Sequence, residues 1–390
     1  MSIFELMSRD SHEEVVFCEN KSAGLRAIIA IHDTTLGPAL GGCRMYPYKS
    51  EQDALIDVLR LSKGMTYKAA AAGLNLGGGK AVIIGDPKTD KTEQLFRAYG
   101  RFVESLNGRY ITAEDSGTSM QDMEYLFMET KYVTGVAPAH GGSGDPAPVT
   151  ALGLFHGLLA GVEQAFDRSF EDEELQNLLL AATADVDGSE DQVDRISRLP
   201  TPSLDGLHVA VQGLGNVGTH LVRHLVDAGA RVTATDIDAE RCAKIKQRYD
   251  IDIVSIDDIY GVDCDIFSPC ALGAVINDDT IDKLNCKLVC GAANNQLAEN
   301  RHGDALRQRG IHYAPDYVVN AGGLINVYVE MEGYVRKRAL RMASAIHANT
   351  RRVFEIADKQ DIPTYIAADR LAEERVEKIG QLKRGFFGGI

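Results

Sequence analysis

The chain has 390 residues, of which 45% are hydrophobic and 25% charged, and its formal net charge at pH 7 is −15. This length favours two domains, and no segment approaches the ~18 unbroken apolar residues that a membrane-spanning helix needs. The negative charge repels phosphate backbones and anionic lipid, so neither a nucleic-acid role nor a membrane role is expected. The acidic N-terminus carries no export signal, which predicts a cytoplasmic protein.

The seven cysteines include no Cys-x-x-Cys pair, and their number is odd. Both features favour reduced thiols that pack in the core over a disulfide framework or a zinc site, so no metal is expected. These exclusions leave two function classes open: an enzyme that acts on a small molecule, and a protein that binds another protein.

The first 149 residues mix two kinds of pattern. Residues 25–33 and 80–87 are apolar runs typical of strands, whereas 50–73 repeats its apolar residues with helical spacing. This mixture predicts an α/β domain. A Gly/Pro-rich loop follows at 141–150, so we expect a hinge near residue 149.

The stretch 75–84, NLGGGKAVII, places Lys80 between three glycines and an apolar run. It is not a phosphate-binding loop, because Leu74 stands where the first glycine is required and Ala81 where a hydroxyl is required. An ammonium with an apolar flank is partly desolvated and gives up its proton more readily, which suits a base. The alternative is a solvated lysine at the start of a strand.

The middle of the chain begins with a helical pattern at 149–166, apolar enough to predict a buried helix. The acidic segment 170–200 follows and contains one short leucine-rich turn. We expect a surface insertion there rather than a domain of its own.

From residue 205 to residue 321, strand-like and helix-like segments alternate regularly. This succession predicts a parallel sheet that is covered on both faces. Residues beyond 330 are mainly helical in pattern, with 338–360 the clearest case. We therefore expect a Rossmann-type domain over 150–330, and a C-terminal helical segment over 331–390 that packs across the domains.

Residues 207–238 contain G-x-G-x-x-G at Gly213, Gly215 and Gly218, between an apolar strand and an amphipathic helix. A second strand ends at Asp236, as in dinucleotide-binding loops. The Asp236 carboxylate would accept hydrogen bonds from a ribose diol and repel a 2′-phosphate, which favours NAD over NADP. Arg241 is expected to lie one turn away, in the next helix. No arginine is therefore expected to offset the negative charge of Asp236.

Three further motifs precede this loop in the order found in amino acid dehydrogenases: KGMTYKAA (63–70), GGGKAVI (77–83) and TAEDSGT (112–118). With matching segments at 37–44, 148–153, 260–277, 312–327 and 362–375, the chain resembles the Glu/Leu/Phe/Val dehydrogenase family over nearly its whole length, and its leucine-specific members most closely. It departs from the family at 170–200, where the usual link is much shorter.

The resemblance implies an NAD-dependent oxidative deamination, an N-terminal domain for substrate and oligomerisation, and an octamer. It implies Lys80 and Asp115 as catalytic groups and Lys68 as the ligand of the substrate carboxylate. It implies that Asn295 contacts both substrate and nicotinamide, and that Thr150 binds the carboxamide. The implied cofactor loop residues are Gly213, Leu214, Gly215, Asn216, Val217, Gly218, Asp236, Cys270 and Ala271.

The residues implied for the substrate side chain are all apolar: Leu40, Ala113, Leu324 and Val327. Glutamate-specific relatives have a lysine at the position of Leu40, so a buried carboxylate here would be unpaired at a cost of several kcal/mol. Leucine and other branched-chain substrates are favoured. An aromatic substrate is the alternative, because 324–334 also resembles a tryptophan-using relative.

Two hypotheses from other functional classes also stay open. A non-catalytic NAD-binding regulator would keep the glycine loop and Asp236 but would have no use for Lys80 and Asp115. A nicotinamide enzyme acting on hydroxy acids would not depend on ammonia.

Overall fold

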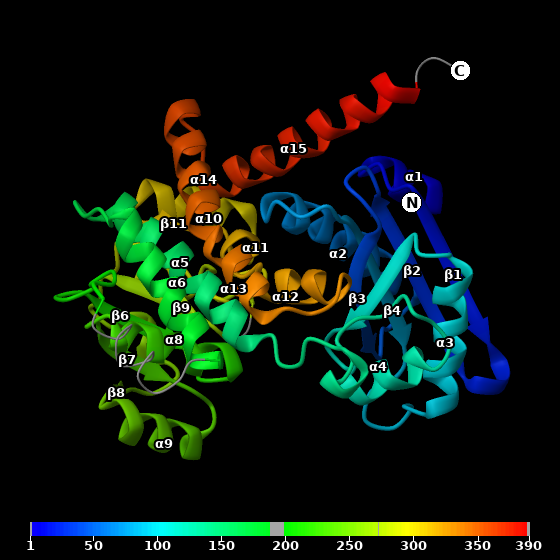
Figure 1. Cartoon of the computed structure of the whole chain (residues 1–390), viewed down its shortest axis with the longest axis horizontal. Coiled ribbons are helices and arrows are strands. Elements are labelled where there is room, and N and C mark those ends of the chain that lie inside the picture. Colours follow the sequence, from blue (N-terminus) through cyan, green and yellow to red (C-terminus); the bar gives the residue numbers. More distant parts are fainter. Residues whose placement is uncertain (1, 188–198, 272, 388–390) are drawn as a thin grey trace. The chain divides into compact units, whose positions relative to one another are not determined.

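The computed structural model describes residues 2–187, 199–271 and 273–387 (Figure 1). The chain forms two compact units. Unit 1 comprises Met1–Gly144, Val327–Tyr334 and Leu371–Ile390, and unit 2 comprises Asp145–Asn326 and Val335–Arg370. The chain therefore passes between the units four times, and the domain limits expected at 149 and 330 stay a prediction.

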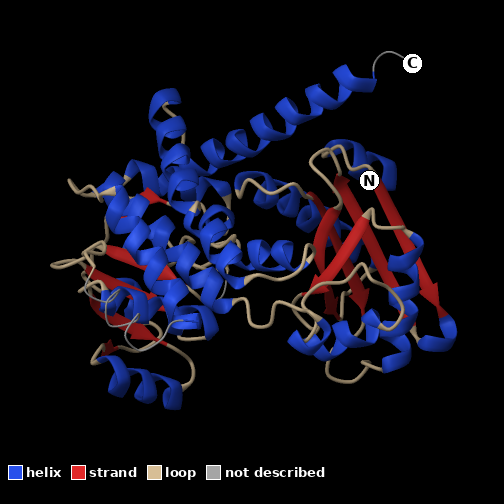
Figure 2. Ribbon diagram, viewed as in Figure 1, coloured by secondary structure: helices blue, strands red, loops and turns tan. Residues whose placement is uncertain are grey.

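Unit 1 contains a five-stranded sheet in the order β1-β2-β4-β3-β5 (Figure 2). The strands are β1 (Glu14–Asn20), β2 (Leu25–Asp33), β3 (Ala39–Tyr46), β4 (Gly77–Ile84) and β5 (Tyr110–Glu114). The pairs β1/β2 and β2/β4 are antiparallel, whereas β3 lies parallel to both β4 and β5. The strand predicted at 25–33 is confirmed, and the one predicted from Lys80 begins three residues earlier, at Gly77.

Helices cover both faces of this sheet. They are α1 (Ile3–Arg9), α2 (Glu51–Ala71), α3 (Glu93–Ser105) and α4 (Met120–Phe127), with short 3₁₀ turns η1 (Lys21–Ala23) and η2 (Pro138–His140). Because side chains alternate along a strand, Ile28 and Ala30 of β2 pack with α2, whereas Ile29 and Ile31 pack with α3. The helix predicted at 50–73 is confirmed as α2, and its N-cap Ser50 accepts a hydrogen bond from the Asp53 amide.

Unit 2 contains a six-stranded, fully parallel sheet in the order β11-β10-β9-β6-β7-β8. The strands are β6 (His208–Gln212), β7 (Arg231–Thr235), β8 (Asp252–Ile253), β9 (Ile266–Pro269), β10 (Leu288–Val289) and β11 (His312–Tyr313). Val209 and Val211 of β6 belong to the core on one face, and Ala210 to the core on the other. The predicted parallel sheet with two covered faces is confirmed.

Several helices begin in unit 2, and most of them contribute to these two cores. They are α5 (Ala147–Ala165), α6 (Asp172–Asp187), α8 (Asn216–Asp227), α9 (Ala239–Tyr249), α10 (Asn300–Gln308), α11 (Asp316–Val319), α12 (Gly322–Glu330), α13 (Arg336–Ser344), α14 (Ile346–Gln360) and α15 (Thr364–Phe387), with turns η3 (Asp258–Gly261) and η4 (Ile281–Lys283). The buried helix predicted at 149–166 is confirmed as α5. The helix predicted at 338–360 is divided at Ala345 into α13 and α14.

The prediction of one short turn within 170–200 is wrong. Helix α6 occupies 16 residues of this segment, and residues 188–198 lie outside the described part of the chain. Leu175 and Leu178 of α6 pack against the core of unit 2, and the buried Asn177 donates to the Pro200 carbonyl at 2.9 Å. The apolar face of α6 was overlooked because acidic residues dominate the composition of the segment. This face packs the helix against the core of unit 2.

Two further properties concern the chain as a whole. Within the described ranges, no helix combines the length and the apolar character needed to cross a bilayer. All seven cysteines, each within those ranges, are unpaired, as expected from their odd number together with the lack of a Cys-x-x-Cys pair, and all are buried or half-buried.

Unit 2 contains two histidines that are buried in a largely apolar environment. His156 in α5 is 1% exposed, and neither ring nitrogen has a hydrogen-bond partner among the described residues. Burial, with smaller contributions from His347 and His224, lowers the pKa of His156 to about 3. Burial likewise lowers the pKa of His224, which stacks on Phe155, to about 3.

We therefore expect His156→Leu to reduce acid destabilisation. The folded pKa lies below the ordinary value of 6.5, so the unfolded chain takes up a proton first and stability is lost as pH falls below about 6.5. One such histidine costs roughly 1 kcal/mol at a pH one unit lower. Thermal unfolding at pH 7.5 and 5.5 should show a smaller loss in the variant than in the original protein. An unchanged loss would contradict this account.

His302→Leu provides the matched control. His302 is 2% exposed, but its Nε2 lies 3.2 Å from Asp278 Oδ1 and its Nδ1 accepts from the Glu299 amide at 3.0 Å. Its replacement removes satisfied hydrogen bonds, so stability should fall at both pH values.

Candidate active site

The two predicted catalytic residues meet in unit 1. Lys80 is the fourth residue of β4, and its Nζ lies 3.1 Å from Oδ1 of Asp115, which follows β5 directly. The Lys80 side chain is 7% exposed and that of Asp115 23% exposed. An ammonium is thus held in the interior by a carboxylate that is still partly exposed to solvent.

Glycines make this contact possible. Strand β3 lies between β4 and β5, and Gly42 of β3 pairs with Ala113 and stands opposite Lys80 by the register of the neighbouring pairs. A Cβ atom at Gly42 would lie 2.9 Å from the Asp115 Cβ and 2.3 Å from the Glu114 carbonyl oxygen. Only a residue without a side chain lets Lys80 and Asp115 approach across β3.

Gly78 and Gly79, which precede Lys80, allow other elements to pack closely on β4. A Cβ at Gly78 would lie 2.1 Å from Thr66 Oγ1 of α2, and one at Gly79 would lie 2.6 Å from the Tyr110 ring. Helix α2 and the Tyr110 ring therefore pack directly on the β4 backbone. Lys68, the predicted carboxylate ligand, lies two residues after Thr66 in the last turns of α2.

Arg44 is a member of this cluster that the sequence-based prediction missed. Its Nε lies 2.9 Å from Asp115 Oδ2, and its Nη1 lies 2.9 Å from Asp57 Oδ2. Burial by itself would raise the pKa of Asp115, but the Lys80 and Arg44 cations outweigh it and hold that pKa below its usual value. The parallel register of Cys43 with Glu114 places Arg44 beside Asp115, and this register is seen only in the structure.

The remaining predicted residues of unit 1 are Lys68, Leu40, Ala113 and Val327. Lys68 is half-buried in α2, Leu40 in β3 is 2% exposed, and Ala113 in β5 is 8% exposed. Val327 belongs to the part of α12 that lies in unit 1. Their contacts with a substrate stay a prediction.

The predicted cofactor loop of unit 2 has the expected setting between β6 and α8. Gly213 has φ +103°, and a Cβ there would lie 2.7 Å from the Cβ of Ala271. A Cβ at Gly218 would lie 2.0 Å from the Gly213 carbonyl oxygen and 3.5 Å from the Cβ of Cys270. The structure thus brings Gly213, Gly218, Cys270 and Ala271 together.

Gly215 differs from these two glycines. It is the N-cap of α8, and a Cβ there would meet no atom of the described residues within 4 Å. Asn216 and Val217 form the first turn of α8, whose N-terminal amides favour an anion. The open side of the loop therefore fits the pyrophosphate of a dinucleotide.

Asp236 fastens this loop to the end of β7. Its Oδ2 accepts from the Leu214 amide at 2.6 Å, and its Oδ1 accepts from the Asp238 amide at 2.9 Å. The prediction that no arginine offsets its charge is wrong, because Arg241 Nη1 reaches from α9 to within 3.1 Å of Oδ1. Burial by itself would raise the pKa of Asp236. The two hydrogen bonds and the Arg241 cation outweigh this effect and hold the pKa below its usual value.

The other predicted residues of unit 2 lie in neighbouring segments. Thr150 in the first turn of α5 donates its hydroxyl proton to the Pro146 carbonyl at 2.9 Å, and a Cβ at Gly323 would lie 3.3 Å from its Oγ1. Gly323 precedes Leu324 in α12, and Leu324 is 6% exposed. Asn295 follows β10 with φ +53°, and its carbonyl accepts from the Ala274 amide at 2.7 Å.

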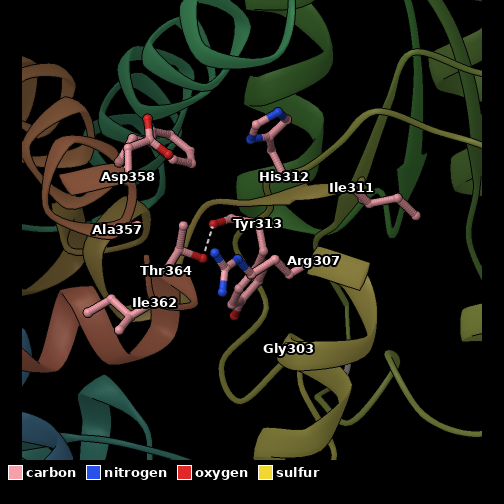
Figure 3. A pocket seen from close by; sticks show the side chains of 10 residues that line it. Gly303, Arg307, Ile311, His312, Tyr313, Ala357, Asp358, Ile362 and Thr364 are labelled. Carbon is pink, nitrogen blue, oxygen red and sulfur yellow. Dashed lines mark hydrogen bonds between the residues drawn. The ribbon is translucent and has the colours of Figure 1, made fainter. Parts of the chain in front are cut away.

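Two cavities lie apart from these residues. One of about 530 Å³ in unit 1 is lined by the end of α1, the end of β2, α2 and α15. One of about 100 Å³ in unit 2 lies beside β11, where Thr364 donates to the Tyr313 carbonyl at 2.6 Å (Figure 3). No predicted site residue lines either cavity, so neither is assigned to the chemistry of Lys80 or of the glycine loop.

Comparison with known proteins gives matches over nearly the whole chain. Residues 12–132 match the family model "Glu/Leu/Phe/Val dehydrogenase, dimerisation domain", and residues 236–384 match "Glutamate/Leucine/Phenylalanine/Valine dehydrogenase". A leucine dehydrogenase of Geobacillus stearothermophilus is 52% identical over 386 residues, which cover 99% of this chain and 96% of that protein.

Two further relatives act on aromatic amino acids by their names. A phenylalanine dehydrogenase of Thermoactinomyces intermedius is 46% identical over 98% of this chain and 96% of that protein. The crystal structure of L-tryptophan dehydrogenase from Nostoc punctiforme has a TM-score of 0.81 and 43% identity, and the match covers 97% of this chain and 99% of that one.

The loop geometry predicts different effects for two glycine substitutions. Gly215→Ala should lower the unfolding temperature only slightly, because the added Cβ meets no protein atom and only the N-cap preference for glycine is lost, yet weaken NADH binding by about tenfold or more through contact with the pyrophosphate. Gly213→Ala should destabilise the protein by roughly 1–3 kcal/mol, because of its positive φ and the contact with Ala271. Thermal unfolding and fluorescence titration with NADH measure the two effects. Normal NADH binding by Gly215→Ala would show that the ligand does not use this side of the loop.

Proposed function

The chain belongs to the Glu/Leu/Phe/Val dehydrogenase family, and we propose that it catalyses the reversible, NAD-dependent oxidative deamination of L-leucine and other branched-chain L-amino acids. The products are the 2-oxo acid and ammonia. The observation that carries the proposal is the 3.1 Å contact of Lys80 with Asp115, in a chain that also has a complete dinucleotide loop.

Each polar residue has a distinct task in this proposal. The Lys68 ammonium binds the substrate carboxylate and orients the α-hydrogen. Asp115 takes a proton from the substrate nitrogen, because only a neutral amine can expel hydride, and the nicotinamide ring, when bound, accepts that hydride. Lys80 carries protons to and from the water that adds to the imine carbon, after which ammonia leaves.

The substrate side chain is proposed to contact apolar residues only. Leu40, Ala113, Leu324 and Val327 offer neither a charge nor a hydrogen bond, so glutamate would have an unpaired carboxylate. The leucine dehydrogenase relatives, at 50–52% identity, favour a branched aliphatic substrate. The aromatic dehydrogenases at 46% identity make phenylalanine and tryptophan the second candidates.

Assembly and location are further parts of the proposal. The matched N-terminal model is described as a dimerisation domain, which supports a homo-oligomer. We propose an octamer in the cytoplasm.

The test is NADH formation from L-leucine at alkaline pH, compared with valine, isoleucine, phenylalanine, tryptophan and glutamate. Lys80→Ala should lower kcat by about two orders of magnitude or more with little change in NADH affinity, because it removes a proton-transfer group. Lys68→Ala should mainly raise KM for the amino acid. Lys63→Ala, whose lysine contacts Asp10 at 2.7 Å in the same unit, is the control and should behave like the original protein.

Other outcomes identify the alternatives. NADH binding without turnover of any of these amino acids would support a non-catalytic regulator. Reduction of 2-oxo acids that does not require ammonia would support a hydroxy-acid enzyme. Equal and mild effects of Lys80→Ala and Lys68→Ala would contradict the assigned roles.

Asp236 should make NAD the preferred cofactor, by about 100-fold in kcat/KM, because a 2′-phosphate would face its negative charge at close range. Asp236→Ser should narrow this preference, since it also releases Arg241 for a phosphate. Arg241→Ala should have the opposite effect and lower the residual activity with NADP. Initial rates with both cofactors measure these ratios, and comparable kcat/KM values in the unaltered protein would contradict the placement of Asp236 beside the ribose.

A further inference from the structure

We propose that Arg44 is a positioning residue for Asp115, which fixes one carboxylate oxygen so that the other exchanges protons with Lys80 and the substrate nitrogen. The inference rests on the proposed deamination. It adds Arg44, and through it Asp57, to the residues on which the reaction depends.

The two oxygens of Asp115 are bound by different cations. Oδ1 lies 3.1 Å from Lys80 Nζ, and Oδ2 lies 2.9 Å from Arg44 Nε. An arginine does not release its proton in the working pH range, so Oδ2 is permanently occupied by a donor. Proton exchange is thereby directed to Oδ1, the oxygen beside Lys80.

Arg44 is itself held in a fixed orientation. Its Nη1 lies 2.9 Å from Asp57 Oδ2 in α2, and the same oxygen accepts the Tyr48 hydroxyl at 2.7 Å. Asp57 Oδ1 accepts from Arg60 at 2.9 Å. A guanidinium can bridge two carboxylates through separate nitrogens in one plane, which a lysine ammonium cannot do with the same geometry.

The charges around Asp115 show what Arg44 contributes. Lys80 and Arg44 are the cations that act on Asp115, and the Asp115 charge in turn adds to the rise in the pKa of the Cys43 thiol and the Tyr110 hydroxyl. Burial raises the pKa of both Cys43 and Tyr110, so neither adds a charge near neutral pH. Without Arg44, only one cation would oppose the Asp115 carboxylate, and protons would bind more tightly in this cluster.

The test compares Arg44→Met with Arg97→Met. Arg97 also contacts two carboxylates in unit 1, Glu93 at 3.2 Å and Glu129 at 2.6 Å, but neither belongs to the site. Arg44→Met should lower kcat with L-leucine by about tenfold to a hundredfold, and should move the acid limb of the kcat/KM profile up by about 0.5–1 pH unit. NADH affinity should not change. Arg97→Met should keep the original kcat and pH profile.

Two milder variants keep the test decisive if Arg44→Met does not fold. Arg44→Lys retains the charge but not the bridge, so kcat should fall while the acid limb stays within about 0.3 pH unit of its original position. Asp57→Asn removes the anchor and should also lower kcat. A loss of thermal stability with an unchanged kcat and pH profile would overturn the proposal, whereas absence of turnover in the original protein would overturn the deamination itself.

Discussion

A buried ammonium requires an anion within hydrogen-bonding distance, because an unpaired charge in a protein interior costs several kcal/mol. Lys80 imposes this requirement on unit 1. Its partner Asp115 stands beyond β5, with β3 in between, and the two side chains meet only because β3 has Gly42 at the crossing. The order of the strands thus puts Gly42 at the crossing, and the glycines before Lys80 let α2 and the Tyr110 ring pack on the β4 backbone.

Unit 2 follows a different constraint, the parallel direction of its strands. The carboxyl ends of parallel strands lie at one edge of the sheet, so the loops after β6, β7 and β9 come together there. Ala271 then packs on Gly213, and Asp236 accepts from Leu214. The carboxylate expected to meet a ribose thus also supports the loop that would hold the pyrophosphate.

Local patterns in the sequence predicted much of this. The spacing of apolar residues predicted β2, α2 and α5, because each buries a continuous face. The same reasoning failed for α6, where acidic residues surround a narrow apolar face. Arg44 and Arg241 were missed or misjudged for another reason. Their partners depend on strand register and on the reach of a long side chain, which no window of neighbouring residues contains.

The seven unpaired cysteines have a practical consequence. Oxidative deamination releases a proton and is favoured in alkaline solution, where exposed thiols become thiolates that oxidise and react with electrophiles. Burial raises the pKa of Cys18 and Cys264 to about 12 and that of Cys286 to about 11, and raises the other four as well. The native thiols are therefore poor nucleophiles under such conditions. A single cysteine introduced on the surface would have a lower thiol pKa than these and would be the preferred target of a maleimide dye.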